Sequence, residues 1–324
     1  MGNDAPLASL SLDLDNQWAY IKIHGDPHWE TFPSFFDVVV PRALAFLKER
    51  DLKITFFVVG QDAALEKNHA SLKAIADAGH EIGNHSFNHE PWLHLYSEAE
   101  IEAELRNAED HIARVTGCKP IGFRGPGFSL SLPTLNVLKR LGYLYDCSTL
   151  PTYLGPLARL YYFMTQRLTS EEKKERGKLF GTWIDGMRST KPYFWQLEHS
   201  RLIEIPVTTM PIFKAPIHVN YVLYLSLYSK TLALAYFRFA LLMCRLTGVQ
   251  PSLLLHSLDF LGKDDTEELA FFPGMGMESE RKIAFVSEII GLLSQHYRVV
   301  TMQEHAQDAA QRAGIGVVEP RFST

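Results

Sequence analysis

The chain of 324 residues has few cysteines, no long uncharged apolar run and no block of like charge. Its three cysteines are scattered, odd in number and form no C-x-x-C pair. This argues against a disulfide scaffold or a cysteine-built zinc site and favours a reducing compartment. No uncharged apolar stretch approaches the roughly 18 residues of a spanning helix, and the first residues lack the basic start and apolar core of a signal peptide. We therefore expect a cytoplasmic protein.

Charge is nearly balanced, with 32 Lys and Arg against 37 Asp and Glu, a formal net charge of −5. Because no basic tail is present, we expect no nucleic-acid partner. The hydrophobic content of 46% and charged content of 21% are typical of a folded globular protein. This length has room for two domains or for one large α/β barrel with insertions.

Short apolar runs alternate with amphipathic segments along most of the chain. We predict strands at residues 10–15, 53–59, 80–83, 121–124, 143–147, 202–206, 252–256 and 297–301. We predict helices at residues 35–50, 63–78, 97–116, 132–141 and 278–296. Strands that alternate with helices indicate a parallel sheet, and seven or eight such units favour a barrel. We expect one domain over residues 1–324.

Two insertions interrupt this rhythm, at about residues 150–200 and 215–250. The first carries the charged run 171–176 beside an amphipathic stretch at 157–168, which favours a solvated helical excursion. The second has only Lys230, Arg238 and Arg245 as charged residues between 219 and 246. On a helix these three lie within about 80° of one another. Residues 217–247 are therefore either an interfacial helix on anionic lipid, with peripheral attachment to the inner membrane face, or a barrel helix buried by its neighbours.

An acidic pair ends the first predicted strand. In an extended chain the side chains of Asp13 and Asp15 share a face and lie roughly 6.5 Å apart. One carboxylate can then bind a metal ion while the other stands one shell away, with room for a water between them. Alone, the pattern is weak, because acidic residues after strands commonly form turns.

Two histidines, His85 and His89, follow the strand predicted at 80–83. Chance alone gives about 0.5 such His-x-x-x-His pairs in a chain with 13 histidines, and His24 and His28 form another, of unassigned role. Placement at the functional rim of a parallel α/β fold singles out His85 and His89. In a strand they would be about 13 Å apart, too far for one ion, so we expect a helical turn that brings them together.

A loop and a last histidine complete the set. Arg124 and the run Gly-Pro-Gly-Phe that follows it indicate a tight rim loop, whose backbone N–H groups can face a developing oxyanion. Arg124 can hold Asp13 through a charge-assisted hydrogen bond; the alternative is a plain turn with a surface arginine. His256 ends the strand at 252–256, where a lone histidine is more often structural.

In this order, each at a strand end, these elements resemble the polysaccharide deacetylase (NodB-homology) family, the carbohydrate esterases of family four, over about residues 10–301. The resemblance implies an α/β fold, a distorted (β/α)7-type barrel with helical insertions. The Asp-x-Asp form is similar to branches that include deformylases of lipid-linked amino sugars.

The resemblance also implies roles. Asp13 would be the catalytic base, Arg124 would orient it, and His256 would be the general acid. Asp15, His85 and His89 would bind a divalent metal, with Zn²⁺ first and Co²⁺, Ni²⁺ or Mn²⁺ as alternatives. The predicted substrate-binding residues are Pro126, Gly127, Phe128 and Asp146, with Asp185 a competitor of Asp146.

Together these features predict a metal-dependent hydrolase that removes an acetyl group, or alternatively a formyl group, from an amino sugar. A lipid-linked or glycolipid precursor at the cytoplasmic membrane face is the favoured partner. An amidohydrolase acting on a small soluble cyclic amide or ureide is the first alternative. A glycosyltransferase is the second, because Asp-x-Asp also binds metal and nucleotide sugars, but it leaves the three histidines unexplained.

Overall fold

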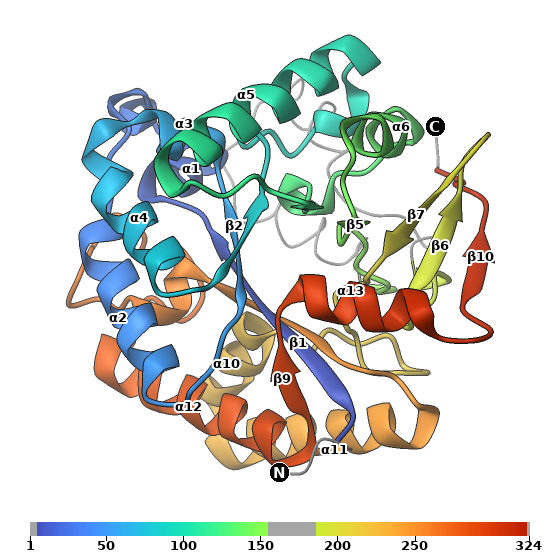
Figure 1. The fold of residues 1–324 in the computed structure, drawn as a ribbon. Helices are drawn as coiled ribbons and strands as arrows, with labels where there is room; N and C mark the ends of the chain where they lie inside the picture. The colour runs from blue at the N-terminus through green and yellow to red at the C-terminus, as the bar shows by residue number, and fades with distance from the viewer. Residues whose placement is uncertain (1–4, 155–185, 323–324) are drawn as a thin grey trace, which may run out of the picture.

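The computed structural model describes residues 5–154 and 186–322. In this part of the chain the strands form one sheet, in the order β10-β6-β7-β5-β4-β3-β2-β1-β8, with β9 also paired to β1 (Figure 1). The strands are β1 Leu7–Leu14, β2 Thr55–Val58, β3 Glu81–Asn84, β4 Gly122–Phe123, β5 Tyr145–Asp146, β6 Tyr193–Gln196, β7 Arg201–Glu204, β8 Ser252–His256, β9 Arg298–Val300 and β10 Gly316–Val318.

The central strands run parallel and curve into a barrel. Every pair in the sheet is parallel except the β6–β7 hairpin, which is antiparallel. Beyond β7 the chain reaches β8, where the Thr208 N–H donates to the Ser252 carbonyl at 3.0 Å and the Ser252 N–H donates to Thr208 Oγ1 at 2.7 Å. This contact joins the two sides of the sheet, so the distorted barrel of α/β class is confirmed.

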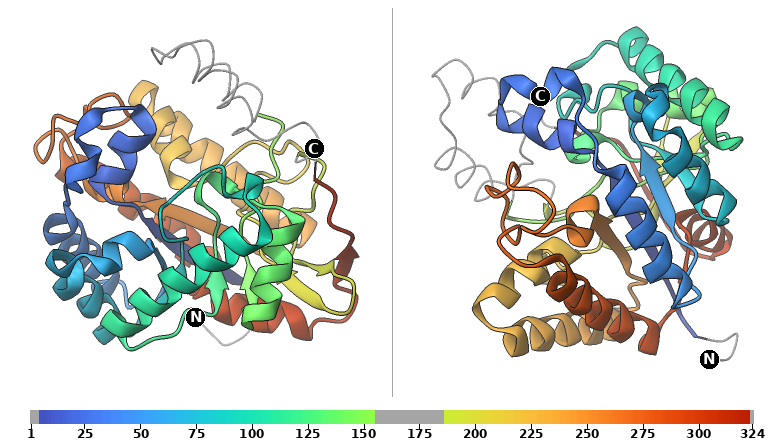
Figure 2. Two further views of the ribbon diagram at one scale, coloured as in Figure 1. Left: turned by 90° about the horizontal axis from the view of Figure 1, so that it is seen from above. Right: turned by 90° about the vertical axis from the view of Figure 1, so that its left-hand side faces the viewer.

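Helices surround the strands, as both views of Figure 2 show. The α-helices are α1 Gln17–His24, α2 Phe36–Lys48, α3 Gly60–Ala64, α4 His69–Asp77, α5 Glu98–Thr116, α6 Leu132–Leu141, α10 Val219–Tyr228, α11 Lys230–Thr247, α12 Ser279–His296 and α13 Met302–Gln311. The 3-10 helices are η1 Pro27–Thr31, η2 Glu66–Asn68, η3 Leu93–Leu95, η4 Pro126–Phe128 and η5 Ser257–Phe260. No helix within the described residues is long and apolar enough to cross a bilayer.

One helix closes the barrel at the end where the strands begin. The backbone N–H of Met302, at the start of α13, donates to Thr55 Oγ1 at 2.8 Å, and Thr55 is the first residue of β2. Met302 and Ala306 pack with Tyr145 and Ile203 in one buried cluster. Because α13 covers this end, the opposite end, where the strands finish, is left for a functional site.

Most predicted elements lie within a few residues of the observed ones. The helix predicted at 97–116 begins as expected: Ser97 caps α5, and Glu100 accepts the Ser97 N–H at 2.8 Å. Four further elements, α1, β6, β10 and α13, were not predicted from the sequence. The residues of the excursion predicted at 157–168 and 171–176 lie outside the described chain, and the division into one domain stays a prediction.

Two predicted helices are wrong as continuous segments. The helix at 63–78 breaks at Leu65, which is extended, because buried Asn68 turns its amide to Asp62 Oδ1 at 3.0 Å. The segment at 219–246 is two helices, since Ser229 is extended and its hydroxyl caps α11 at Leu232 N–H. In both places side-chain hydrogen bonds to the backbone or to a buried partner override helical propensity.

Candidate metal centre

The side chains of β1 alternate between an apolar face and a polar face of the strand. Leu10, Leu12 and Leu14 lie in the main apolar core, between the sheet and the surrounding helices. Ser11 and Asp13 point to the other face and both bond to Arg124. The local sequence Leu-Ser-Leu-Asp-Leu therefore delivers a carboxylate to the polar interior at the strand end.

The segment from His85 to His89 turns without forming a helix, so the predicted helical turn is wrong. Ser86 and His89 adopt the left-handed region, with φ of 61° and 52°, and this reverses the chain within four residues. Glu104 of α5 holds the turn, because its Oε2 accepts the backbone N–H groups of Phe87 at 3.1 Å and Asn88 at 2.9 Å. The turn brings the two imidazoles together, with ring centroids 5.0 Å apart.

Asp15, His85 and His89 converge, and their potential ligand atoms all lie within 4.8 Å of one another. Asp15 Oδ1 is 3.4 Å from His85 Nε2 and 3.1 Å from His89 Nε2. Among the described residues this is the one group of three or more His, Cys, Asp or Glu side chains arranged to hold an ion.

The donor set fits a divalent ion with an open coordination position. All three side chains are buried, and the Asp15 carboxylate faces both imidazoles. Two imidazole nitrogens and one carboxylate are the ligand combination of many catalytic zinc sites, in which a water or substrate takes the remaining position. The residues therefore fit the ion that the motif predicts, and they leave its identity open.

The charges in the centre are strongly coupled. Burial raises the pKa of Asp15, but the attraction of His89 and hydrogen bonds from both histidines outweigh it and hold that pKa well below its usual range. For His85 burial lowers the pKa, yet the carboxylates of Asp13 and Asp15 raise it overall. A metal ion binding here must displace the Nε2 proton of a protonated His85, because only the neutral imidazole is a ligand.

Arg124 connects the metal ligands to the second carboxylate. Its Nη1 lies 2.6 Å from Asp13 Oδ1 and 2.9 Å from Ser11 Oγ, and its guanidinium sits 4.3 Å from the centre of the Phe57 ring. Its carbonyl oxygen accepts from His85 Nδ1 at 2.6 Å. That bond holds the proton of the neutral ring on Nδ1 and leaves the lone pair of Nε2 free to bind a metal. The arginine is buried and not the surface residue of the alternative interpretation.

His256 ends β8 directly beside Asp13, its register partner on β1. Partners in a parallel ladder point to the same face, so the predicted acid and base share the polar interior. The ring Nδ1 is 3.0 Å from Nδ2 of Asn220, near the start of α10. The backbone N–H of His256 donates to Asp259 Oδ2 at 2.8 Å.

The loop after Arg124 is tight but internally bonded. The Phe128 N–H donates to the Gly125 carbonyl at 2.9 Å, and the Ser129 N–H donates to the Pro126 carbonyl at 3.0 Å. These two donors bond within the loop, and the role predicted for the loop N–H groups towards an oxyanion stays a prediction. Gly125 is required here because a Cβ would meet the Ser129 carbonyl oxygen at 2.0 Å. Gly127 and Phe128, with φ of 58° and 61°, turn the loop tip.

Asp146 is bonded inside the protein, and its predicted substrate contact stays a prediction. It is fully buried, and its Oδ1 accepts from Ser148 Oγ at 2.6 Å. Ser148 Oγ in turn accepts the Gly125 N–H at 2.8 Å. Burial, with the neighbouring Glu204 carboxyl, raises the pKa of Asp146 well above its usual range. Asp146 thus supports the rim loop from beneath, while its competitor Asp185 lies outside the described residues.

Three residues near this centre were missed by the motif analysis. Tyr20 lies on α1, which begins two residues after Asp15; burial, then the charge of Asp15, raises the pKa of its buried hydroxyl. His218 caps α10 with its ring centroid 6.1 Å from that of His256, and burial lowers its pKa to about 3. Asn220 is the third. No sequence spacing marks them, because α1 and α10 meet the strand ends only in the folded barrel.

The other His-x-x-x-His pair does not form a metal centre. His24 stacks on Phe271 with ring centroids 3.7 Å apart, and its Nδ1 lies 2.9 Å from Asp26 Oδ2. His28 lies on η1 and belongs to no candidate cluster among the described residues.

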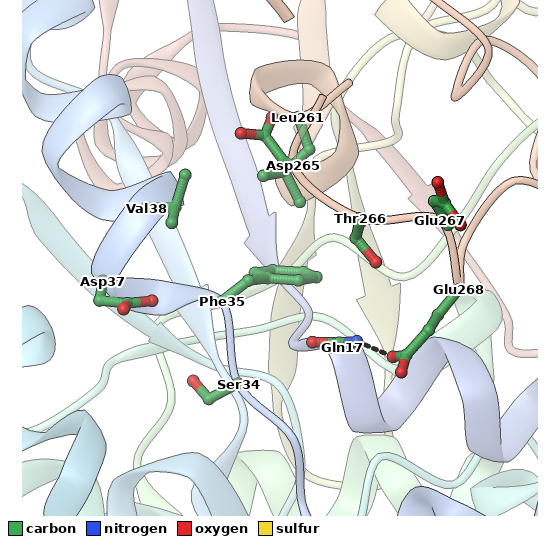
Figure 3. A pocket seen from close by; sticks show the side chains of 10 residues that line it. All are labelled: Gln17, Ser34, Phe35, Asp37, Val38, Leu261, Asp265, Thr266, Glu267 and Glu268. Carbon is green, nitrogen blue, oxygen red and sulfur yellow. Dashed lines mark hydrogen bonds between the residues drawn. The ribbon is translucent and has the colours of Figure 1, made fainter. Parts of the chain in front are cut away.

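A cavity of about 460 Å³ lies between the starts of α1 and α2 and the loop after η5 (Figure 3). It is lined by Gln17, Ser34, Phe35, Asp37, Val38, Leu261, Asp265, Thr266, Glu267 and Glu268. Gln17 bonds to Glu268 across it, and Asp265 pairs with Arg42 at 2.7 Å. None of the predicted site residues lines this cavity, so it is separate from the metal centre.

Comparison with known proteins gives a family match over residues 27–145, to the polysaccharide deacetylases. The chain is 32% identical over 120 residues to the peptidoglycan deacetylase of Helicobacter pylori, covering 37% of this chain and 40% of that protein. It is 31% identical over 125 residues to the chitooligosaccharide deacetylase of Azorhizobium caulinodans, covering 38% and 54%. The aligned part is thus about half or less of these relatives.

Solved structures share the fold. A Mycobacterium smegmatis protein provisionally called a polysaccharide deacetylase has a TM-score of 0.61 at 19% identity, with 99% of this chain and 97% of that chain covered. The allantoinase Puue has a TM-score of 0.57 at 17% identity, with 95% and 91% covered.

The matched segment contains His85, His89, Arg124 and Phe128, whereas Asp13, Asp15 and His256 lie outside it and join the site through the fold. Through residues 27–145 the chain is related to the polysaccharide deacetylase family, and the resemblance that its motifs indicated is confirmed.

Proposed function

We propose that this protein is a metal-dependent hydrolase that removes an N-acyl group from an amino sugar. One observation carries the proposal: a buried group of Asp15, His85 and His89 stands beside Asp13 and His256, which are register partners on neighbouring strands. A metal centre flanked by a carboxylate and an imidazole is the arrangement that amide hydrolysis needs. The relatives named as carbohydrate deacetylases support the choice of substrate class.

In this proposal Asp15, His85 and His89 would hold the ion, which would supply the Lewis acidity that lowers the pKa of a water and polarises an acyl carbonyl. Asp13, held in place by Arg124, takes a proton from the water as its oxygen attacks the carbonyl carbon. His256 delivers a proton to the amide nitrogen as the carbon–nitrogen bond breaks. An amine leaves readily only when protonated, which is why an acid is needed opposite the base.

We propose Zn²⁺ as the resident ion, with Co²⁺, Ni²⁺ and Mn²⁺ as alternatives that tolerate the same nitrogen and oxygen ligands. Acetyl is the acyl group that we propose to be removed from the sugar, and formyl is the alternative. A panel of lipid-linked and soluble N-acyl amino sugars, incubated with metal-loaded protein, tests this by mass spectrometry. Loss of an acetyl or a formyl mass from one substrate supports the proposal. Loss from none, with a small cyclic ureide hydrolysed instead, overturns it in favour of the soluble amidohydrolase.

The proposed substrate is lipid-linked and presented at the cytoplasmic face of the membrane, and the outer surface of α11 supports this. Exposed on one side of α11 are Leu232, Phe239, Leu242 and Leu246, with exposed fractions between 46% and 73%. The opposite side, including Phe237 and Leu241, is buried in the main core. One side of α11 therefore packs in the core, while the other side leaves an apolar strip exposed.

The charge around this strip favours anionic lipid. No Asp or Glu occurs between Glu204 and Asp259 in the sequence. Arg238 and Arg245 are exposed on the same side of α11 and form no ion pair with a described residue, whereas Lys230 pairs with Glu288 at 2.5 Å. Phe213 extends the strip, with its ring centroid 6.3 Å from that of Phe239. Apolar side chains edged by cations bind anionic bilayers.

Vesicle flotation tests this surface without disturbing the core. Phe239→Ser with Leu246→Ser, and separately Arg238→Gln with Arg245→Gln, should each reduce binding to phosphatidylglycerol vesicles while phosphatidylcholine vesicles bind weakly throughout. Matched controls on other surfaces are Leu95→Ser, which is 53% exposed, and Arg106→Gln with Arg312→Gln. Equal flotation of all variants would remove the membrane from the proposal and leave the hydrolase intact.

A further inference from the structure

The ring of His256 is held by a side chain that no motif includes. The carboxamide nitrogen of Asn220 lies 3.0 Å from Nδ1 of this ring. Asn220 lies in the first turn of α10, far from β8 in sequence but against it in the barrel. We propose that Asn220 is the positioning residue for His256 and holds its ring through Nδ1 in both protonation states; this rests on the proposed function, in which His256 is the acid.

The chemistry of the amide suits that task. A carboxamide has both a donor and an acceptor, and a half-turn about its last bond exchanges them. With the neutral ring, Nδ2–H donates to Nδ1, which leaves the ring proton on Nε2. With the protonated ring, Oδ1 accepts the proton on Nδ1. A carboxylate in the same place would only accept, and would favour the charged ring.

The other groups around His256 do not replace this contact. From η5, Asp259 forms a capping box with His256: its carboxylate accepts the His256 backbone N–H, and its own backbone N–H is directed at the His256 side chain. That backbone donor cannot accept a proton from the ring, and burial raises the pKa of the Asp259 carboxyl to about 6 against the attraction of His256. From α10, His218 is neutral at physiological pH and its ring packs on Tyr221 at 4.4 Å. From β1, Asp13 is engaged with Arg124. Among these groups, Asn220 has the neutral side chain that can both donate to and accept from the ring.

The fold gives Asn220 a rigid base. Val219 and Val222, on either side of it in α10, are fully buried in the main core. The helix therefore cannot rotate without exposing apolar surface, and the amide stays opposite the end of β8. A side chain on a rigid element controls the geometry of its partner better than one on a loop.

Two substitutions separate the parts of this proposal. Asn220→Leu keeps the approximate volume and removes both hydrogen-bonding groups, whereas Asn220→Asp keeps the shape and adds a negative charge. Ser226→Ala is the matched control, because it lies on the same helix and its hydroxyl bonds only to the Leu223 carbonyl. All three are measured for metal content and for thermal unfolding.

For Asn220→Leu we expect kcat to fall about tenfold to a hundredfold, part of what a positioned acid contributes, with KM changed by less than about twofold. For Asn220→Asp we expect activity to persist and the basic limb of the pH–rate profile to move up by about one pH unit or more. The Ser226→Ala profile should match the wild type. A full kcat in Asn220→Leu, or superimposed profiles for Asn220→Asp and the wild type, overturns the proposal.

An NMR titration of the His256 ring, assigned by comparison with His256→Gln, keeps the two hypotheses apart. It requires neither substrate nor turnover. The titration midpoint should move up in Asn220→Asp and much less in Asn220→Leu. If it does so in a protein that hydrolyses no N-acyl sugar, Asn220 positions the ring and the proposed function fails. If the midpoint of Asn220→Asp does not move while the wild type is active, the proposed function stands and Asn220 does not position the acid.

Discussion

Arg124 Nη1 lies 2.6 Å from Asp13 Oδ1, and both side chains are almost completely buried. The pair joins strand β1 to the loop after β4 inside the barrel. Burial lowers the pKa of Arg124, but the Asp13 carboxylate more than compensates and raises it overall. The arginine is therefore always charged, and removing it would leave Asp13 as a buried carboxylate without its counter-ion.

Arg124→Met should lower the free energy of unfolding by about 3–5 kcal/mol, because breaking one side of a buried ion pair strands the other charge. Urea unfolding of the metal-free protein measures this. The control is Arg140→Met, which removes an arginine that pairs with Glu98 at 2.5 Å but is 45% exposed. This variant should lose far less stability than Arg124→Met, because solvent screens an exposed ion pair. Similar costs for the two variants would contradict the buried-pair assignment.

Metal content should separate the ligands from the groups that move protons. His85→Ala should lose the ion, because one of three converging ligand atoms disappears. Asp13→Asn and His256→Ala should keep it and lose most turnover, by roughly a hundredfold or more. Elemental analysis of purified variants, paired with the substrate panel, checks both halves. A His85→Ala protein with full occupancy would refute the ligand assignment.

Glu104→Gln should weaken metal binding although Glu104 is not a ligand. Its carboxylate accepts two backbone N–H groups of the turn that carries His85 and His89. Loss of such support typically costs 10- to 100-fold in metal affinity. Competition with a chelator of known affinity measures the change. Glu102→Gln, on the same helix and paired with Arg106 and Arg140 at the surface, should bind metal as the wild type does, and an equal loss in both variants would point to a general effect on α5.

His305 should make the fold sensitive to acid. Burial, then the charge of Arg312, lowers its pKa to about 4, and its Nδ1 bonds to Ser9 Oγ at 2.8 Å. Between about pH 6.5 and pH 4 the unfolded chain takes up a proton here that the folded chain does not. Stability contributed by the neutral ring is thus lost as pH falls through this window, at about 1.4 kcal/mol per pH unit.

Urea unfolding in chelator, from pH 4.5 to pH 7.5, tests this with His305→Gln, which can still bond to Ser9. The free energy of unfolding of the wild type, relative to that of the variant, should fall by about 2 to 3 kcal/mol as the pH falls. Parallel curves for the two proteins would show that His305 is not the titrating group.

Elements with a strong local pattern were predictable. The helix at 132–141 matches α6, because Ser131 caps its start and Gly142, with φ of 82°, ends it. The strand at 252–256 matches β8, a short run of buried leucines ending in His256. Elements without such a pattern were missed: α1 buries Trp18, Ala19, Tyr20 and Ile21 in succession, so no apolar stripe with a polar opposite face marks it.

The motif residues and their chemistry were readable from the chain, because a carboxylate pair, two histidines and a glycine-rich loop after strands each carry a local signature. The turn at His85–His89 was not, since left-handed backbone at Ser86 and His89 is sustained by Glu104 from another element. The burial of Asp146 could not be predicted from the chain either, because it depends on what packs around β5.

By itself the sequence determined the strand–helix alternation, the family resemblance and the residue types able to bind a metal and move protons. These depend on periodicity and on side-chain chemistry, which are properties of the chain. The tertiary structure decided which of those side chains meet: the parallel register sets Asp13 beside His256, and α10 brings Asn220 to that ring. Contacts between residues more than 30 positions apart arise from packing, so no local pattern can contain them.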